Sequence, residues 1–132
     1  MTAIKKQINY WRESAERNFE TAKSLFRLKR YDACLFFCHL AIEKILKGLI
    51  TKRSRKTPPL IHDLAKLAES TRLKLSNEQI NNLRIITNFN IAGRYDNIKF
   101  NFYKQCTKPY TEKYLKISQE LYLWLKEQYQ KK

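Results

Sequence analysis

Glycine and proline are scarce in this chain, which has two glycines and three prolines among 132 residues. Because these residues mark most turns, their scarcity predicts long helices joined by few loops. Runs rich in Leu, Lys, Glu, Gln and Ala, which all favour helix, agree with this prediction. The two glycines stand far apart, at positions 48 and 93. They can therefore form neither a phosphate-binding loop nor a dinucleotide-binding fingerprint.

Cysteine and histidine are also few, with three and two copies. The odd number of cysteines and their spacing fit neither a disulfide framework nor a zinc site. Cys34 and Cys38 lie in an apolar segment and are interpreted as buried hydrophobic residues in a reducing cytosol. His39 and His62 fall on different predicted elements, so we expect no metal site and no cofactor.

Targeting signals and long apolar runs are missing as well. The N-terminus after the first methionine is largely polar and contains no apolar run, which argues against a signal peptide. The longest apolar run, residues 33–42, contains His39 and is too short to span a bilayer. These absences predict a soluble, cytoplasmic protein without membrane contact.

Acidic residues are outnumbered, because 12 Asp and Glu face 27 Lys and Arg and leave a net charge of +15. Such a field attracts phosphates, nucleic acid or an acidic protein, although a solvated basic surface has the same composition. Since two successive prolines at positions 58 and 59 exclude helix, we predict a basic loop before them that docks onto phosphate or stays solvated. The loop carries Lys52, Arg53, Arg55 and Lys56.

Apolar residues recur at steps of three and four along most of the chain, which indicates amphipathic helices. We expect helices over residues 3–28 and 31–51, and further helices that begin near residues 62, 77 and 108. Thr2 is a predicted N-cap, and Ser76 with Gln79 forms a predicted capping box. Residues 88–102 lack periodicity and predict an irregular segment, and residues 128–132 are expected to fray. The predicted fold is all-α: a single domain over residues 1–132, built as an up-and-down antiparallel helical bundle of four to five helices.

The segment from Tyr31 to Ile50 is too apolar for a surface helix and predicts the central helix of the bundle. Glu43 interrupts its apolar run, and a buried carboxylate requires a partner. One interpretation is a pair with Lys47, one turn later, on a partly wet strip. The other is that the carboxylate lines a site. His39 lies on the same helix and is interpreted as a core histidine.

Three pieces of the sequence resemble the HEPN domain family, whose central helix reads roughly Ala-x-Glu-Lys-x-Leu-Lys. The first is the segment Ala41-Ile42-Glu43-Lys44-Ile45-Leu46-Lys47-Gly48, preceded by Tyr31-Asp32-Ala33 at the entry to the helix. The others are His62-Asp63-Leu64-x-x-Leu67 and Gly93-Arg94-Tyr95. They occur in the family's order and cover nearly the whole chain. The resemblance implies a helical bundle, as the periodicity does.

Some HEPN proteins are ribonucleases, with an Arg followed four to six residues later by a His, late in the domain. In that chemistry the His moves a proton and the Arg holds the phosphate. This chain has no histidine after His62, so Arg84 and Arg94 lack such a partner. Arg55 and His62 match the spacing, but they stand in the basic loop, and we favour a structural role for His62. We therefore expect a protein that is not an enzyme, with Arg55 and His62 as weak catalytic candidates.

Arg94 and Tyr95 stand in the predicted irregular segment, where side chains can be aimed inward. A buried guanidinium needs a carboxylate or a phosphate. One hypothesis is a structural bridge from Arg94 to Glu43. The other is a pocket in which Arg94, Tyr95 and Lys47 hold a nucleotide or an RNA phosphate, since HEPN domains are often found near nucleotides or RNA.

The resemblance implies a non-enzymatic HEPN module that acts with a separately encoded minimal nucleotidyltransferase, as a component of a toxin–antitoxin pair. We also expect a homodimer. The eight Tyr, seven Phe and two Trp exceed what one small core can bury, and aromatic residues are enriched at interfaces. The alternatives are an RNA-cleaving toxin, that is, a ribonuclease, and a basic nucleic-acid-binding module without a partner enzyme.

Overall fold

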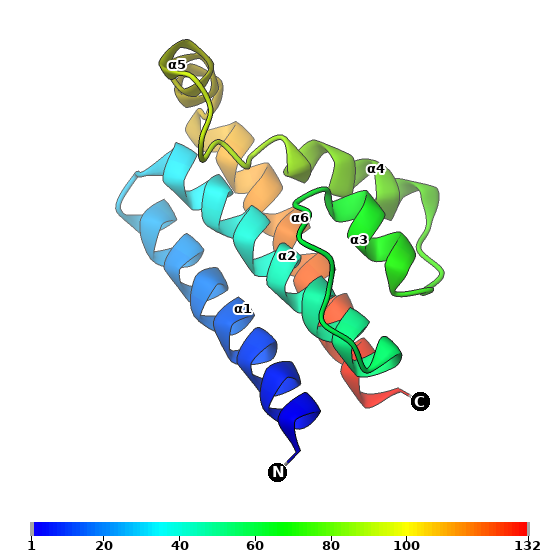
Figure 1. Ribbon diagram of the computed structural model, residues 1–132. Helices are drawn as coiled ribbons and strands as arrows, with labels where there is room; N and C mark the ends of the chain where they lie inside the picture. Colours follow the sequence, from blue (N-terminus) through cyan, green and yellow to red (C-terminus); the bar gives the residue numbers. More distant parts are fainter. Residues whose placement is uncertain (1, 132) are drawn as a thin grey trace.

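The computed structural model describes residues 2–131, and in that range it contains helices and no strands (Figure 1). The predicted all-α bundle is confirmed. The elements are α1 (Ala3–Arg27), α2 (Tyr31–Ser54), α3 (Leu64–Ser70), α4 (Asn77–Thr87), α5 (Asp96–Gln105), α6 (Lys108–Glu127) and the short 3-10 helix η1 (Gln128–Gln130).

The long helices lie side by side, with α2 between α1 and α6 (Figure 1). α1 and α2 form an antiparallel hairpin, whereas α6 runs beside α2 in the same direction. This direction is possible because α3, α4 and α5 carry the chain back to the end where α2 begins. α3 and α4 form a second, shorter hairpin against α2, and α5 projects beyond the bundle.

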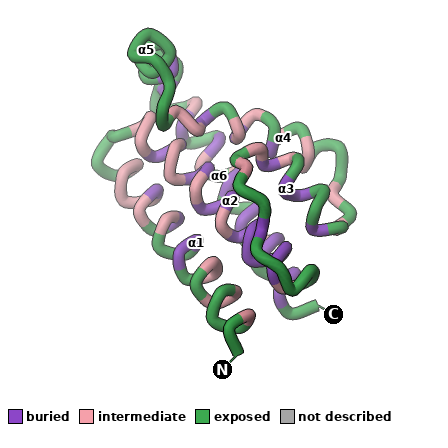
Figure 2. Tube along the Cα trace, viewed as in Figure 1, coloured by how far each residue is buried: buried purple, intermediate pink, exposed green. Residues whose placement is uncertain are grey.

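The core follows α2, which is the most buried helix of the molecule (Figure 2). Its apolar side chains are covered by α1 on one side and by α6, α3 and α4 on the others. This confirms the prediction of a central helix. The fully buried side chains include Cys34, Leu35, Cys38, Ala41, Ile42, Leu46 and Leu49, and His39 lies among them.

Three helix starts are fixed by the residues that the sequence indicated. The Thr2 side chain accepts a hydrogen bond from the Lys5 backbone N–H. Ser76 and Gln79 exchange the two hydrogen bonds of a capping box at α4. At α6, the Thr107 side chain caps the helix and a proline stands in its first turn, where no backbone N–H is required.

Several boundaries differ from the sequence-based expectations. α2 continues to Ser54 rather than ending near Thr51, so Lys52 and Arg53 lie on its last turn and only Arg55 and Lys56 remain in the loop. α3 begins at Leu64 rather than near residue 62, and the Asp63 side chain caps it. The segment expected to be irregular contains α5. Its pattern was missed because Phe102 is the only residue of α5 that is buried.

The end of the chain is ordered through Gln130, where fraying was expected; Lys132 lies outside the described residues. Tyr129 is buried, and its hydroxyl donates a 2.7 Å hydrogen bond to the Ile45 carbonyl oxygen. The contact is possible because residue 48 is glycine: a Cβ there would collide with the Tyr129 hydroxyl and lie 2.9 Å from Trp11 Cβ. Gly48 therefore lets the C-terminal segment close onto α2.

Candidate functional site

A buried cluster of charged side chains surrounds Glu43, in the middle of α2. The side chains of Glu43 and Lys47 are each only 7% exposed. Lys47 Nζ donates a hydrogen bond to Glu43 Oε2 at 2.9 Å. His62 Nδ1, in the loop before α3, donates to Glu43 Oε1 at 3.0 Å. The pair between Glu43 and Lys47 is thus present, and His62 is a second partner that ties the loop to α2.

The loop between α2 and α3 carries His62 back along α2 (Figure 1). Two prolines, Pro58 and Pro59, keep this stretch out of helix. An extended chain covers about 3.3 Å per residue against about 1.5 Å in a helix. Nine loop residues, 55–63, therefore suffice to return from the end of α2 to Glu43.

The electrostatics of the cluster keep Glu43 charged and His39 neutral. Burial raises the pKa of the Glu43 carboxyl, but hydrogen bonds from Lys47 and His62 outweigh this effect and the pKa lies below its usual value. Burial lowers the pKa of His39, which is completely enclosed one turn earlier on α2. His39 Nε2 donates to the His62 carbonyl oxygen at 3.1 Å, so α2 holds both the backbone and the side chain of His62.

The ring of His62 is held by a carboxylate and faces solvent, because its side chain is 63% exposed. Such a ring can transfer protons if a substrate reaches it. Its partner by sequence spacing, Arg55, is exposed and caps α2 in the left-handed conformation, with φ of 63°. No hydrogen bond joins the Arg55 and His62 side chains in the described structure. The contacts of His62 thus support the structural role that the sequence favoured.

Arg94 and Tyr95 are placed far from the Glu43 cluster, just before α5. Both side chains are exposed. Between residues 2 and 131, no ion pair joins Arg94 to Glu43 or to any other carboxylate. The predicted Glu43–Arg94 bridge is not formed, because Lys47 and His62 occupy the carboxylate. Lys47 does not line the cavity to which Arg94 belongs; its Nζ binds Glu43 and lies 5.7 Å from the centre of the Trp11 ring.

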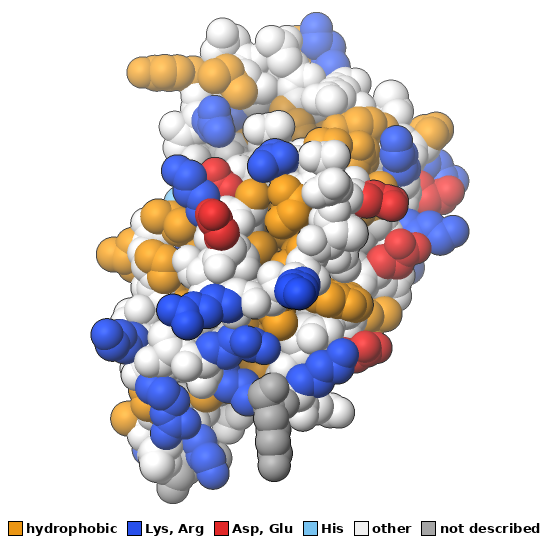
Figure 3. Space-filling view, turned by 90° about the vertical axis from the view of Figure 1, so that its right-hand side faces the viewer, with side chains coloured by type: hydrophobic (Ala, Val, Ile, Leu, Met, Phe, Trp, Pro, Cys, Tyr) orange, Lys and Arg blue, Asp and Glu red, His pale blue; other side chains and the backbone are white. Residues whose placement is uncertain are grey.

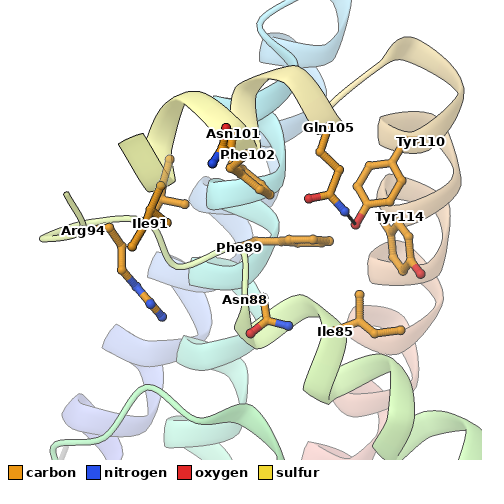
Figure 4. Close-up of a pocket in the computed structure, with 11 residues that line it drawn as sticks. Ile85, Asn88, Phe89, Ile91, Arg94, Asn101, Phe102, Gln105, Tyr110 and Tyr114 are labelled. Carbon is orange, nitrogen blue, oxygen red and sulfur yellow. Dashed lines mark hydrogen bonds between the residues drawn. The ribbon is translucent and has the colours of Figure 1, made fainter. Parts of the chain in front are cut away.

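Arg94 instead lines a cavity of about 630 Å³ between α4, α5 and α6, which we call the α5 cavity. Its wall is aromatic, and Phe89 projects into the middle of it (Figure 4). The ring of Phe89 lies 5.6 Å from that of Phe102 and 5.5 Å from that of Tyr114. Tyr110 completes the group, 4.9 Å from Tyr114. Phe89, Phe102 and Tyr114 are buried and form the floor of the cavity, whereas Tyr110 is half-buried and is the ring that a ligand could reach.

Polar side chains belong to the lining of the same cavity (Figure 4). Gln105 Nε2 donates a 3.1 Å hydrogen bond to the Tyr110 hydroxyl, which positions the amide beside the ring. The Arg94 guanidinium comes from the turn before α5. The polar side chains of the lining are Asn88, Arg94, Asn101 and Gln105.

The α5 cavity offers the three kinds of group that recognise a nucleotide. Aromatic faces stack on bases. Side-chain amides match the donor and acceptor pattern of base edges. An arginine without a carboxylate partner binds phosphate through its planar fork. The arrangement therefore fits a flat, aromatic, anionic ligand.

The sequence pointed to Arg94 but not to the rest of this cavity. The apolar periodicity placed Tyr110 and Tyr114 on the core-facing stripe of the last helix and Phe89 with the apolar residues of the fourth, and all three do pack in or against the core. The usable signal was the mixture of aromatic and amide residues over positions 88–114. Tyr95, also a predicted site residue, is 81% exposed and lies outside the cavity lining.

Neither a metal-binding cluster nor a membrane-spanning helix is present within residues 2–131. No group of three or more His, Cys, Asp or Glu side chains there could hold a metal ion. No helix in that range is long and apolar enough to cross a membrane.

Comparison with known proteins agrees with the fold and the pattern of residues. The family model of the HEPN domain matches residues 8–128, so the chain belongs to the HEPN domain family. The crystal structure of TT1696 from Thermus thermophilus superposes with a TM-score of 0.77 at 20% sequence identity, covering 92% of this chain and 97% of that one. At this identity the likeness shows the fold. A search of curated proteins finds no match.

Proposed function

We propose that this protein is a non-enzymatic HEPN module that binds a nucleotide, free or within RNA, in the α5 cavity. The observation that carries the proposal is the combination of fixed aromatic rings with Arg94 in one cavity. Membership of the HEPN family supports a nucleotide- or RNA-related role. In this proposal the base stacks on the ring of Tyr110, which is half-buried, and Arg94 holds the phosphate.

The proposal is tested by calorimetric titration with adenosine monophosphate and with a short single-stranded RNA. Replacing Arg94→Gln removes the charged donor, and the affinity is expected to fall about tenfold or more, as for other hydrogen bonds to charged groups. The matched control is Arg84→Gln, which changes an exposed arginine on α4 outside the cavity. Equal affinities for the two variants would refute the assignment of Arg94.

We propose in addition that the protein is a homodimer and that α5 lies at its interface. The side chains of Tyr95, Ile98, Phe100 and Tyr103 are all more than two-fifths exposed, as aromatic and aliphatic residues of interfaces are before assembly. The rings of Phe100 and Tyr103 stack with their centres 6.3 Å apart.

The double change Phe100→Ser and Tyr103→Ser should convert a dimer into a monomer in light scattering. Leu28→Ser with Leu60→Ser, at positions outside α5 that are even more exposed, should leave the mass unchanged. A monomeric mass for the unaltered protein at micromolar concentration would overturn the proposal.

The partner proposed for the module is a separately encoded minimal nucleotidyltransferase, in a toxin–antitoxin pair. Family membership is the support for this step. Co-expression tests it: the two proteins should purify together, and growth should depend on the ratio of the two. Independent purification and unaltered growth would remove this part of the proposal without affecting the nucleotide site.

A ribonuclease is the second candidate function, favoured by the contact between Glu43 and the exposed ring of His62. If His62 were the catalytic base, His62→Gln would abolish cleavage of a single-stranded RNA. Our proposal predicts instead that the purified protein leaves the RNA intact. Cleavage that disappears in His62→Gln would establish the ribonuclease.

A further inference from the structure

A second cavity, of about 530 Å³, lies at the opposite end of α2 from the α5 cavity. It is bounded by the last turn of α2, the end of α3 and the residues that follow α6. Figure 3 shows Lys and Arg side chains gathered on the lower left of this face, with the acidic side chains higher and to the right. The charged residues in the lining are all basic: Lys52, Arg53, Arg72 and Lys131. We call it the basic cavity.

The four cations of the basic cavity have no acidic partner. Between residues 2 and 131, none of them forms an ion pair. Other polar groups of the lining are satisfied within the protein: the Thr71 hydroxyl donates to the Ala68 carbonyl oxygen, and the Gln128 amide donates to that of Trp124. The positive charge is therefore the feature that the basic cavity presents to a ligand.

The negative ends of helix dipoles neutralise part of the positive charge of the basic cavity, but not all of it. Three helical segments end at the basic cavity, namely α2, α3 and α6 with η1. Each C-terminus carries about half a negative charge, so together they supply roughly 1.5. About 2.5 positive charges of the four remain. A ligand with two or three negative charges would neutralise the remainder, and this is the charge of adjacent phosphate groups.

The backbone of Arg72, at the rim of the basic cavity, is left-handed, with φ of 61°. At helix ends this conformation usually belongs to glycine, because a Cβ makes it costly. Arg55 and Lys29 have the same conformation, so it is not particular to this cavity. What Arg72 contributes is its planar guanidinium, which is suited to phosphate oxygens.

We propose that the basic cavity is a second binding site, which takes contiguous phosphate groups. They come either from the polyphosphate of a free nucleotide or from the backbone of an RNA strand. Arg53 and Arg72 bind the phosphates, one from each side of the cavity, and the positive charges of Lys52 and Lys131 attract them further. The inference goes beyond the proposed function and does not depend on it, because the two cavities share no residue.

The test uses two probes, inorganic tripolyphosphate in calorimetry and a labelled single-stranded RNA of about 12 nucleotides in anisotropy. The site variant carries Arg53→Gln and Arg72→Gln. The control carries Arg17→Gln and Lys116→Gln, which remove the same charge from exposed positions on α1 and α6 outside this cavity. The site variant should weaken binding by about tenfold or more, and the control by less than about threefold.

The outcomes separate the two sources of phosphate. Weaker binding of both probes to the site variant identifies a site for free polyphosphate, and weaker binding of RNA alone identifies a site for the RNA backbone. Equal behaviour of the site variant and the control on both probes would overturn the proposal. Failure of the unaltered protein to bind either probe at about 1 mM would also overturn it.

One further variant distinguishes a loss of phosphate binding from a loss of folding. Arg72→Gly suits the left-handed backbone and should keep or raise the melting temperature, yet it should weaken phosphate binding. An Arg72 with only a structural role would show no loss of binding. Arg94→Gln, in the α5 cavity, should leave tripolyphosphate binding unchanged. Failure of the proposed nucleotide site and failure of the basic cavity are therefore distinguishable.

Discussion

At the scale of single residues, the question raised by Glu43 was what neutralises a carboxylate inside an apolar helix. The sequence predicted that a partner must exist, and Lys47 followed from helical spacing. His62 could not be predicted in the same way, because its approach depends on the path of the loop after α2. Arg94 was the expected long-range partner, and it lies on the far side of the α4–α5 turn instead.

Double-mutant cycles measure how strongly Glu43 interacts with Lys47 and with Arg94. Glu43→Gln leaves the buried Lys47 ammonium without its counter-charge, so we expect a loss of about 3 kcal/mol in unfolding free energy. Combining Glu43→Gln with Lys47→Met should cost less than the sum of the single changes, because neither orphaned charge remains. Glu43→Gln combined with Arg94→Gln should be additive. Denaturant unfolding measures both cycles, and strong coupling to Arg94 would contradict the structure.

The Glu43 cluster also predicts how stability depends on pH. The folded pKa of His39 lies below 6.5, so under mildly acidic conditions the unfolded chain binds a proton that the folded protein does not. Unfolding free energy should therefore decrease as the pH falls below 6.5, by at most about 1.4 kcal/mol per pH unit from this group. Glu43, whose pKa lies below 4.5, adds a second loss below that pH.

Urea unfolding between pH 7.5 and 5.5 measures the His39 contribution. His39→Gln has no titrating group at this position, so its stability should change less over this range than that of the unaltered protein. If the two proteins lose stability in parallel, His39 is not the source of the dependence.

At the scale of helices, most of the fold follows from periodicity and caps, and the exceptions share one cause. α1, α2 and α6 each present an apolar stripe to the core, and the Ser76 box and Thr107 mark their helices directly. α5 could not be recognised because it buries little of its surface, so its sequence does not carry a 3.6-residue apolar period. The extension of α2 to Ser54 was not predicted, because the prolines at positions 58 and 59 were expected to end the helix near Thr51. A proline restricts only the residue directly before it, so α2 can continue to Ser54.

The contact between Gly48 and Tyr129 yields a prediction about how α1, α2 and the C-terminal segment pack. On a solvent-exposed helix, Gly→Ala would stabilise by about 1 kcal/mol. Here Gly48→Ala should instead destabilise by about 1–3 kcal/mol, because the new Cβ meets the Tyr129 hydroxyl and Trp11. The loss should be smaller in a Tyr129→Phe background, which removes the colliding oxygen. Thermal unfolding of the four proteins checks this, and stabilisation by Gly48→Ala would show that the segment does not close.

At the scale of the whole molecule, the net charge of +15 indicated an attraction for phosphates, nucleic acid or an acidic protein, or a solvated basic surface. The structure contains an aromatic cavity with one arginine at one end and a basic cavity at the other. The basic cavity was not predictable, since it collects residues from three segments that are distant in sequence, and the α5 cavity depends on how α4, α5 and α6 fold together. For this reason the sequence identified Arg94, Lys52 and Arg53 but not Tyr110, Arg72 or Lys131.

RNA binding by such a molecule should be salt-dependent and show little sequence preference. Four phosphate contacts on a single strand give a slope of about −2.8 in a plot of log affinity against log salt. The affinity should therefore fall about 50-fold between 50 and 200 mM salt. Anisotropy titrations of oligouridine and oligoadenosine over this range measure both properties. A salt-independent affinity, or strong discrimination between the two, would contradict this expectation.

The central claim, a nucleotide bound in the α5 cavity, is tested most directly by a proton NMR titration with adenosine monophosphate. A base stacked in that cavity changes the ring currents around it, so the ring signals of Phe89, Tyr110 and Tyr114 should shift as the nucleotide is added. Those of Trp11 and Tyr129, toward the other end of α2, should remain in place. Shifts confined to Trp11 and Tyr129, or none at saturating nucleotide, would contradict the account.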